Sequence, residues 1–327
     1  MKNKKIVIAG GTGFIGNALT AYFGNDNEIV ILTRNVNDGN NNANRLFTID
    51  KNHQHNVRLV QWNAKDSGEW CKEIDGCDLV INLTGKSVNC RYTEKNKQEI
   101  FDSRTNSTKA IGDAIKNAIV PPKLWINAAS ATIYPHATEK ANDEYSTDFD
   151  NDFSVQVCKL WEKSFFDQRT AFSRKVALRM AVTLGDGGVM VPYLNLCKFA
   201  LGGKQGNGKQ MYSWVHAEDV CRAIDFIWQK TELEGAFNVS SPNPVNNETF
   251  MHTLRKVTGH AIGLPAYTWM LKTGAAVIGT ETELLLKSRW VLPTKLQENG
   301  FTFKYPHLQK AFEDLVKKLP RRAYHLF

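Results

Sequence analysis

Residues 6–16 read Ile6-Val-Ile-Ala-Gly10-Gly-Thr-Gly13-Phe-Ile-Gly16, and this stretch determines the predicted fold. An apolar run opens it, glycines follow at four positions, and a helical spacing of apolar residues continues to residue 23. A strand, a tight turn and a helix in this order are the context in which such glycines bind a dinucleotide. The alternative interpretation is an ordinary turn between a strand and a helix. Gly10 accommodates the turn, Gly13 lets a pyrophosphate approach the backbone, and Gly16 lets the helix pack on the strand. The predicted cofactor contacts here are Gly10, Thr12, Gly13, Phe14, Ile15 and Gly16.

The end of the second predicted strand, residues 28–34, bears on the choice of cofactor. A site for NAD usually places Asp or Glu near this point to accept a hydrogen bond from the ribose 2′-hydroxyl, whereas a site for NADP offers Arg to the 2′-phosphate. This strand ends in Thr33 and Arg34, with no carboxylate. We therefore predict NADP(H) as the cofactor, with a solvated surface arginine as the alternative interpretation of Arg34.

Strands and helices alternate along the first half of the chain. Apolar runs typical of buried strands recur, and segments of helical spacing lie between them. This alternation predicts an α/β fold of the Rossmann type, a doubly wound parallel sheet. The further predicted strands are residues 57–62, 78–83, 123–128, 176–182 and 235–239, and the longest predicted helices are residues 94–118 and 154–168.

Ligands of a parallel sheet bind at the carboxyl ends of its strands. This rule places Leu83, Thr84 and Gly85 along the cofactor, and it lets the side-chain amide of Asn63 reach the adenine. Residues 35–56 contain eight asparagines without apolar periodicity, which indicates a long surface loop.

The alternation of strands and helices ends near residue 188, and the later part of the chain is mostly helical in pattern. We predict an NADP-binding Rossmann domain over residues 1–184, completed by residues 217–240. Residues 185–216 and 241–327 then form a smaller, mostly helical C-terminal substrate cap.

Composition narrows the class of protein. The net charge is +8, from 41 Lys and Arg against 33 Asp and Glu, and the basic residues are scattered, which argues against nucleic acid as a partner. No apolar stretch reaches transmembrane length, so we expect no membrane span. The six cysteines include no Cys-x-x-Cys pair and no His-Glu-x-x-His motif occurs, so we expect no metal site and a reduced, cytoplasmic protein.

Several motifs together resemble those of one known family, and they cover nearly the whole chain. The chain is similar to the extended short-chain dehydrogenase/reductases, and more closely to their atypical epimerase-like branch with a small C-terminal domain. The matching pieces are residues 10–16, 32–34, 82–85, 91–104, 157–162, 201–203, 213–219, 243–246 and 291–306. The resemblance implies that Thr33 and Arg34 hold the 2′-phosphate of NADP. It also implies a cofactor channel lined by Leu83, Thr84, Glu99, Arg104 and Thr183.

The catalytic pair of that family is missing. Working short-chain dehydrogenases combine Ser or Thr with Tyr-x-x-x-Lys, in which the ammonium lowers the pKa of the phenol and the phenol passes a proton. Ser130 matches the serine position, although a hydroxyl that satisfies backbone at a strand end is an alternative role. The tyrosine position is occupied by Ser154 and the lysine position by Cys158. None of the nine tyrosines has Lys four residues later.

Three residues are candidate substitutes for the missing acid. Cys158 carries a thiol whose pKa can be tuned, but a buried apolar role is its alternative. Tyr134 can reach in from the loop after Ser130, or simply pack beside the sheet. His216 can supply a proton near neutral pH, or cap the helix that follows it.

Two hypotheses for function follow from this pattern. The first is an NADP(H)-dependent oxidoreductase or epimerase that acts on a small polar molecule, such as a sugar or a nucleotide sugar. The second is a non-catalytic NADPH-binding sensor or partner-binding protein. Helices 94–118 and 154–168 are where relatives of this fold often pair, which makes a homodimer an expectation.

Overall fold

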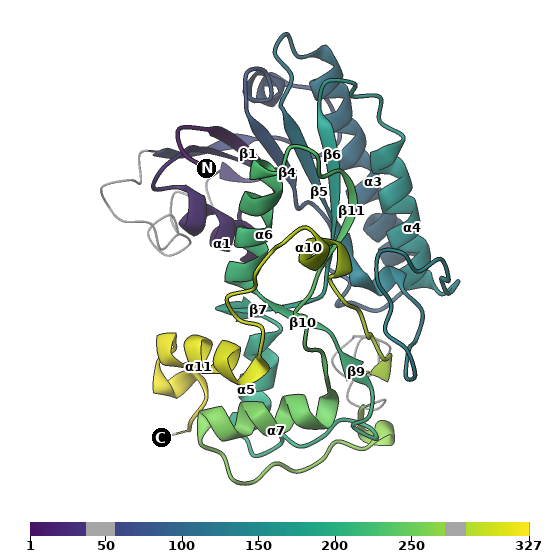
Figure 1. The fold of residues 1–327 in the computed structure, drawn as a ribbon, viewed down its shortest axis with the longest axis vertical. Coiled ribbons are helices and arrows are strands. Elements are labelled where there is room, and N and C mark those ends of the chain that lie inside the picture. Colours follow the sequence, from purple (N-terminus) through teal and green to yellow (C-terminus); the bar gives the residue numbers. More distant parts are fainter. Residues whose placement is uncertain (37–55, 272–285, 327) are drawn as a thin grey trace.

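Seven apolar strands form one parallel sheet, which lies in the upper part of the view in Figure 1. The structure is a computed structural model that describes residues 1–36, 56–271 and 286–326. The predicted loop 35–56 lies almost entirely outside the described residues. From edge to edge the strands are β11 (Gly235–Val239), β6 (Arg174–Met180), β5 (Leu124–Ser130), β4 (Leu79–Asn82), β1 (Lys5–Ala9), β2 (Glu28–Thr33) and β3 (Val57–Gln61). Strands β1 and β2 pair in parallel, and their register begins with Lys5 opposite Glu28.

Helices cover both faces of this sheet, because successive residues of a buried strand point to opposite sides. Ile6 and Ile8 of β1 pack in one hydrophobic cluster with residues of α1 (Phe14–Phe23) and α6 (Ala217–Gln229). Val7 and Ala9 pack in a second cluster on the other face, with residues of α3 (Glu94–Asn117) and α4 (Phe153–Phe166). The predicted doubly wound α/β fold is therefore confirmed.

Beyond the sheet, the chain builds a smaller region with its own hydrophobic core. Phe250 and Phe312 meet in this core with ring centroids 5.1 Å apart and an edge-to-face geometry. The helices here are α5 (Met190–Lys198), α7 (Asn247–Thr258) and α11 (Leu308–Lys318). Short strands accompany them, namely β7 (Val182–Gly185), β8 (Gly187–Gly188) and β10 (Trp214–His216) in one sheet, and β9 (Met211–Tyr212) paired with β12 (Val245–Asn246).

The remaining elements are short. Helix α10 (Thr294–Glu298) buries Leu296 in the same cluster as α1 and α6, so the C-terminal part of the chain returns to the main sheet. Among the described residues the 3-10 turns are η2 (Glu69–Glu73), η3 (Ala131–Ile133) and η4 (Arg321–Ala323). Within the part of the chain that the structure describes, no helix is both long and apolar enough to cross a membrane. The predicted domain boundaries stay a prediction.

Candidate cofactor and active site

The glycines of the first turn meet three different demands. Gly10 has a φ of +74°, which favours glycine, and it closes the turn after β1. A Cβ on Gly16 would lie 2.3 Å from the carbonyl oxygen of Gly11, so only glycine lets α1 pack against this turn. A Cβ on Gly13 would meet only the Gly10 carbonyl oxygen, at 3.5 Å, among the described atoms. Packing within the described chain therefore does not require glycine at 13, whereas a bound molecule approaching the backbone would.

The end of β4 lies directly against this turn. A Cβ on Gly10 would be 3.2 Å from the backbone nitrogen of Thr84, which shows how closely the two segments approach. The side-chain oxygen of Asn82 accepts from that nitrogen at 3.0 Å, while its amide donates to Asn127 at 2.8 Å. A buried amide pair thus fixes the turn that carries Leu83, Thr84 and Gly85.

Two polar atoms at this turn are buried without a hydrogen-bond partner among the described residues. They are the hydroxyl of Thr84 and the side-chain oxygen of Asn17 in the first turn of α1. Buried polar atoms are nearly always hydrogen-bonded, so an exception asks for an explanation. A polar ligand bound at the glycine turn would supply a partner for buried atoms of this kind.

Arg104 reaches the same edge of the sheet from α3. Its Nη1 donates to the carbonyl oxygens of Lys86 (3.1 Å) and Ile100 (3.0 Å), and its guanidinium lies 4.9 Å from the centre of the Trp161 ring. A Cβ on Gly85 would stand 3.2 Å from the guanidinium carbon. Its Nε is buried without a hydrogen-bond partner, and no described carboxylate forms an ion pair with it. Burial lowers the pKa of Arg104, yet a guanidinium keeps its proton in proteins.

Glu99 stands one turn earlier on α3 and pairs with the same loop. Its carboxylate bonds the ammonium of Lys86, which lowers the pKa of Glu99, and Lys86 also donates to Asn96 at 2.7 Å. Sequence patterns alone gave Glu99 and Arg104 no role, because a charged helical residue usually faces solvent. Their assignment to the cofactor came only from the resemblance, and it stays a prediction.

The remaining predicted cofactor residues have different surroundings. Thr33 is buried at the end of β2, and Arg34 beside it is exposed. Asn63 uses its amide within its own loop, because its oxygen accepts from the backbone of Asp66 (2.8 Å) and its nitrogen donates to the Asp66 carboxylate (2.9 Å). Thr183 is buried in β7, where its hydroxyl donates to a backbone carbonyl at 3.2 Å.

Ser130 and Cys158 come together where β5 ends against α4. The half-buried Ser130 accepts from the backbone of Thr132 at 3.2 Å and so caps η3. Cys158 packs with Ala131 and Ile133 of that same turn. Burial raises the pKa of Cys158 to about 12, although nearby arginines oppose this shift, so the thiol is protonated at neutral pH.

Tyr134 points away from solvent into a buried hydrogen-bond network. Its hydroxyl donates to Asn238 at 3.0 Å and accepts from Arg179 at 2.8 Å, and the side chain has no exposed surface. Arg179 in turn forms two bonds of 2.8 Å with Glu162 of α4. Burial raises the pKa of Tyr134 to about 12, although Arg179 opposes the rise. These contacts match the packing role that the sequence left open, and they give the phenol no path to a substrate in this conformation.

His216 lies between α6 and α11 rather than with Ser130 and Cys158. Its Nδ1 accepts from the backbone of Glu218 at 3.1 Å and caps α6, while its ring packs on Tyr305 and its Nε2 lies 3.3 Å from Asp314. Burial lowers the pKa of His216 to about 4, so the ring is neutral at physiological pH. The capping role is therefore the one that the geometry supports.

The comparisons with known proteins agree with this geometry. A model described as the NAD dependent epimerase/dehydratase family matches residues 6–240. The chain belongs to this family. A model for a domain of unknown function, DUF1731, matches residues 268–315. Together the two matches confirm the predicted atypical epimerase-like branch with its small C-terminal domain.

Individual members of the epimerase family match over nearly their whole length. Epimerase family protein YfhF of Bacillus subtilis is 32% identical over 312 residues, covering 95% of this chain and 97% of that protein. The crystal structure of human epimerase family protein SDR39U1 (isoform 2) with NADPH superposes with a TM-score of 0.82 at 25% identity, covering 96% and 99% of the two chains. A UDP-N-acetylglucosamine 4-epimerase from Methanobrevibacter ruminantium M1 has the same fold, with a TM-score of 0.72 at 16% identity and coverage of 97% and 98%.

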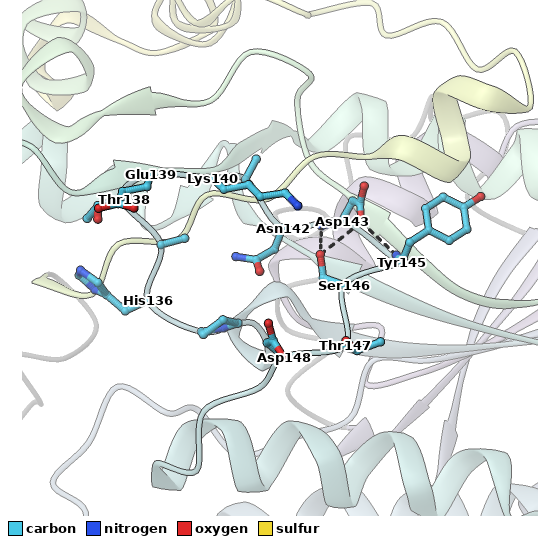
Figure 2. A pocket seen from close by; sticks show the side chains of 13 residues that line it. His136, Thr138, Glu139, Lys140, Asn142, Asp143, Tyr145, Ser146, Thr147 and Asp148 are labelled. Carbon is cyan, nitrogen blue, oxygen red and sulfur yellow. Dashed lines mark hydrogen bonds between the residues drawn. The ribbon is translucent and has the colours of Figure 1, made fainter.

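One cavity of this epimerase-family chain was not predicted from the sequence. The loop over residues 135–148, which follows Ser130 and η3, curls around a hollow of about 700 Å³ (Figure 2). Its lining is polar and carries both charges, including Glu139, Lys140 and Asp148. A hollow formed by a single loop has no periodic signal in the sequence, which is why it could not be predicted.

Proposed function

We propose that this chain is an NADP(H)-dependent oxidoreductase of the epimerase type that acts on a small polar molecule. The observation that carries the proposal is the set of unsatisfied polar groups around the glycine turn. The Thr84 hydroxyl, the Asn17 side-chain oxygen and the Arg104 Nε are all buried without a partner among the described residues. A dinucleotide offers hydroxyls and phosphates to such groups, so the residues present fit this cofactor. The likeness to the NADPH-bound human relative supports the same conclusion.

The preference for NADP over NAD rests on Arg34. It is exposed at the end of β2, next to the buried Thr33, where a 2′-phosphate lies in folds of this type. Its guanidinium can donate two parallel hydrogen bonds to a phosphate, and a carboxylate is missing from this position. Arg104 would supply positive charge nearer to Cys158. Cys158 occupies the helix position at which working short-chain dehydrogenases have lysine.

Ser130 has the central role in the chemistry of this proposal. The bound nicotinamide supplies or accepts the hydride. The hydroxyl of Ser130, half-buried at the end of β5, donates a hydrogen bond to the oxygen of the reacting carbon and holds it in place. Cys158 packs beside the turn that follows Ser130. Among the three candidate proton donors it is the one whose side chain has neither a hydrogen bond nor an ion pair with the described residues. Its thiol is protonated at neutral pH.

A panel of reactions tests this proposal. NADPH oxidation is followed at 340 nm with carbonyl compounds and nucleotide sugars, and NADP⁺ reduction with the matching alcohols. We expect turnover with at least one pair, and we expect Ser130→Ala to lower kcat by about 10²–10³-fold with NADPH binding retained. Ser130→Thr, which keeps a hydroxyl, is the control for the lost cap of η3.

Two results would contradict this proposal. Equal turnover by Ser130→Ala and the wild type would contradict the role given to Ser130. Tight NADPH binding without turnover across the whole panel would contradict the enzyme and favour the alternative of a non-catalytic NADPH sensor. That alternative has one observation behind it, because burial holds the pKa values of Cys158, Tyr134 and His216 far from neutrality.

A further inference from the structure

Basic side chains gather at the end of the molecule that lies away from the main sheet, around α5, α7 and the end of α11 (Figure 1). Three described segments, residues 187–212, 249–271 and 315–326, make up this basic end, and they contain nine Lys or Arg but no Asp or Glu. Of the 41 Lys and Arg in the chain, 32 are left for the remainder, against 33 Asp and Glu, so the net charge of +8 comes from this end. The nine are Lys198, Lys204, Lys209, Arg255, Lys256, Lys317, Lys318, Arg321 and Arg322.

Hydrogen bonds hold the three segments of the basic end together. The Leu264 amide donates to the Ala200 carbonyl oxygen at 2.8 Å, which joins the second segment to the first. The Lys198 ammonium donates to the Arg322 carbonyl oxygen at 2.9 Å, which joins the third segment to the first. These charges are scattered in the sequence and come together only in the fold.

Most of the nine charges have no carboxylate beside them. The Lys204 ammonium lies 3.8 Å from a carboxylate oxygen of Glu248, and the Lys318 ammonium lies 2.6 Å from one of Asp314. The other seven form no ion pair among the described residues. Like charges that gather without counter-charges attract an anionic partner.

Large apolar side chains are exposed among these charges. Phe199 and Leu201 follow the end of α5, and Ile262 and Leu264 lie in the segment that bonds to the same loop at Ala200. The exposed fractions of these four side chains run from 44% for Leu201 to 67% for Ile262. An exposed apolar patch with a polar rim marks a site of interaction with a protein or a membrane.

We propose that the basic end docks on an anionic phospholipid surface. The apolar side chains would enter the boundary between headgroups and acyl chains, while Lys and Arg bind the anionic headgroups, and docking of this kind needs no helix that crosses the bilayer. A single-stranded RNA would use the charges but would stack on aromatic side chains, whereas Leu201, Ile262 and Leu264 are aliphatic. An anionic lipid surface is therefore the partner that fits both the charges and the apolar side chains. This role is independent of the proposed reaction.

Vesicle co-sedimentation of the full chain tests this inference. One set of vesicles is phosphatidylcholine alone, and the other holds equal parts of phosphatidylcholine and phosphatidylserine. We expect binding to the anionic vesicles to be at least about tenfold tighter than to the neutral ones, and to weaken as salt is added. Arg321→Gln combined with Arg322→Gln should weaken it by about 10–30-fold, and Ile262→Ser combined with Leu264→Ser by at least about tenfold.

Matched pairs of residues elsewhere on the surface are the controls. Lys123 and Arg169 are exposed basic residues in the connections that lead into β5 and β6. Ile119 and Phe172 are 88% and 86% exposed in the same two connections. Lys123→Gln with Arg169→Gln is the control for charge, and Ile119→Ser with Phe172→Ser is the control for apolar surface. We expect neither control to change vesicle binding.

Several outcomes would overturn the inference. They are equal binding to the two kinds of vesicle, no binding to either, and equal binding by the paired variants and their controls. Binding of an RNA oligonucleotide or of polyglutamate without binding to anionic vesicles would also overturn it, and would assign the surface to another polyanion. Thermal unfolding of every variant is measured alongside, and we expect unchanged midpoints because the substituted side chains are exposed. The charge pair and the apolar pair test the surface separately, so either pair alone decides the outcome.

Discussion

Gly16→Ala is expected to lower both the free energy of unfolding and the affinity for the cofactor. Gly13→Ala is expected to lower the affinity for the cofactor alone. A Cβ at 16 would lie 2.3 Å from the Gly11 carbonyl oxygen, and backbone atoms cannot move aside as the end of a side chain can. Overpacking of this kind costs about 1–3 kcal/mol or more, and we expect the upper end. The distortion would also displace the turn that receives the pyrophosphate.

Gly13 provides the matched comparison. Its φ is −80°, which any residue adopts, and its added Cβ would make only an ordinary contact of 3.5 Å within the described chain. We therefore expect the free energy of unfolding of Gly13→Ala to lie within about 1 kcal/mol of the wild-type value. Its NADPH affinity should fall at least about tenfold, because the methyl group would occupy the approach of the phosphates. Thermal unfolding and an NADPH titration measure both quantities, and undiminished NADPH binding by Gly13→Ala would refute the assigned role of this turn.

Glu162→Gln is expected to destabilise the protein by about 3–5 kcal/mol, because it leaves a buried arginine without its counter-charge. Both side chains of the Arg179–Glu162 pair are about 10% exposed, and two bonds of 2.8 Å join them. Arg179 also donates to the buried hydroxyl of Tyr134, so the loss extends to the network that holds β6, α4 and β11 together.

A surface carboxylate at the C-terminal end of the same helix is the control for this prediction. Asp167 pairs with Lys163 at 2.7 Å, but these side chains are 59% and 70% exposed. Asp167→Asn should change the free energy of unfolding by no more than about 0.5 kcal/mol. Urea denaturation of the two variants measures the difference, and similar values for Glu162→Gln and Asp167→Asn would mean that the buried pair contributes little.

The Rossmann core was predictable because its signals are local. The strand, the turn at Gly10 and the helix after Gly13 lie within one short stretch, and each apolar run elsewhere matches a strand within a few residues. Glycine spacing also predicted a close approach at Gly16, but the structure shows that Gly16 approaches the backbone of Gly11 in the turn rather than the strand.

Side-chain partners from distant elements were not predictable. Tyr134 is four residues after Ser130, so its sequence position suggested chemistry, yet Asn238 and Arg179 draw its hydroxyl into the interior. His216 precedes a helix as expected, but its burial depends on α11, almost a hundred residues later.

Binding of NADP(H) through the glycine turn and Arg34 underlies the catalytic role that we propose for this chain. The most direct measurement titrates the purified protein with NADPH and with NADH, following quenching of tryptophan fluorescence, with Arg34→Ala and Arg169→Ala alongside. We expect the wild type and Arg169→Ala to bind NADPH about 10–100-fold more tightly than NADH, and Arg34→Ala to lose this difference. Equal affinity of the wild type for the two cofactors would make Arg34 a solvated surface residue. Binding of neither cofactor would contradict both the cofactor site and the proposed reaction.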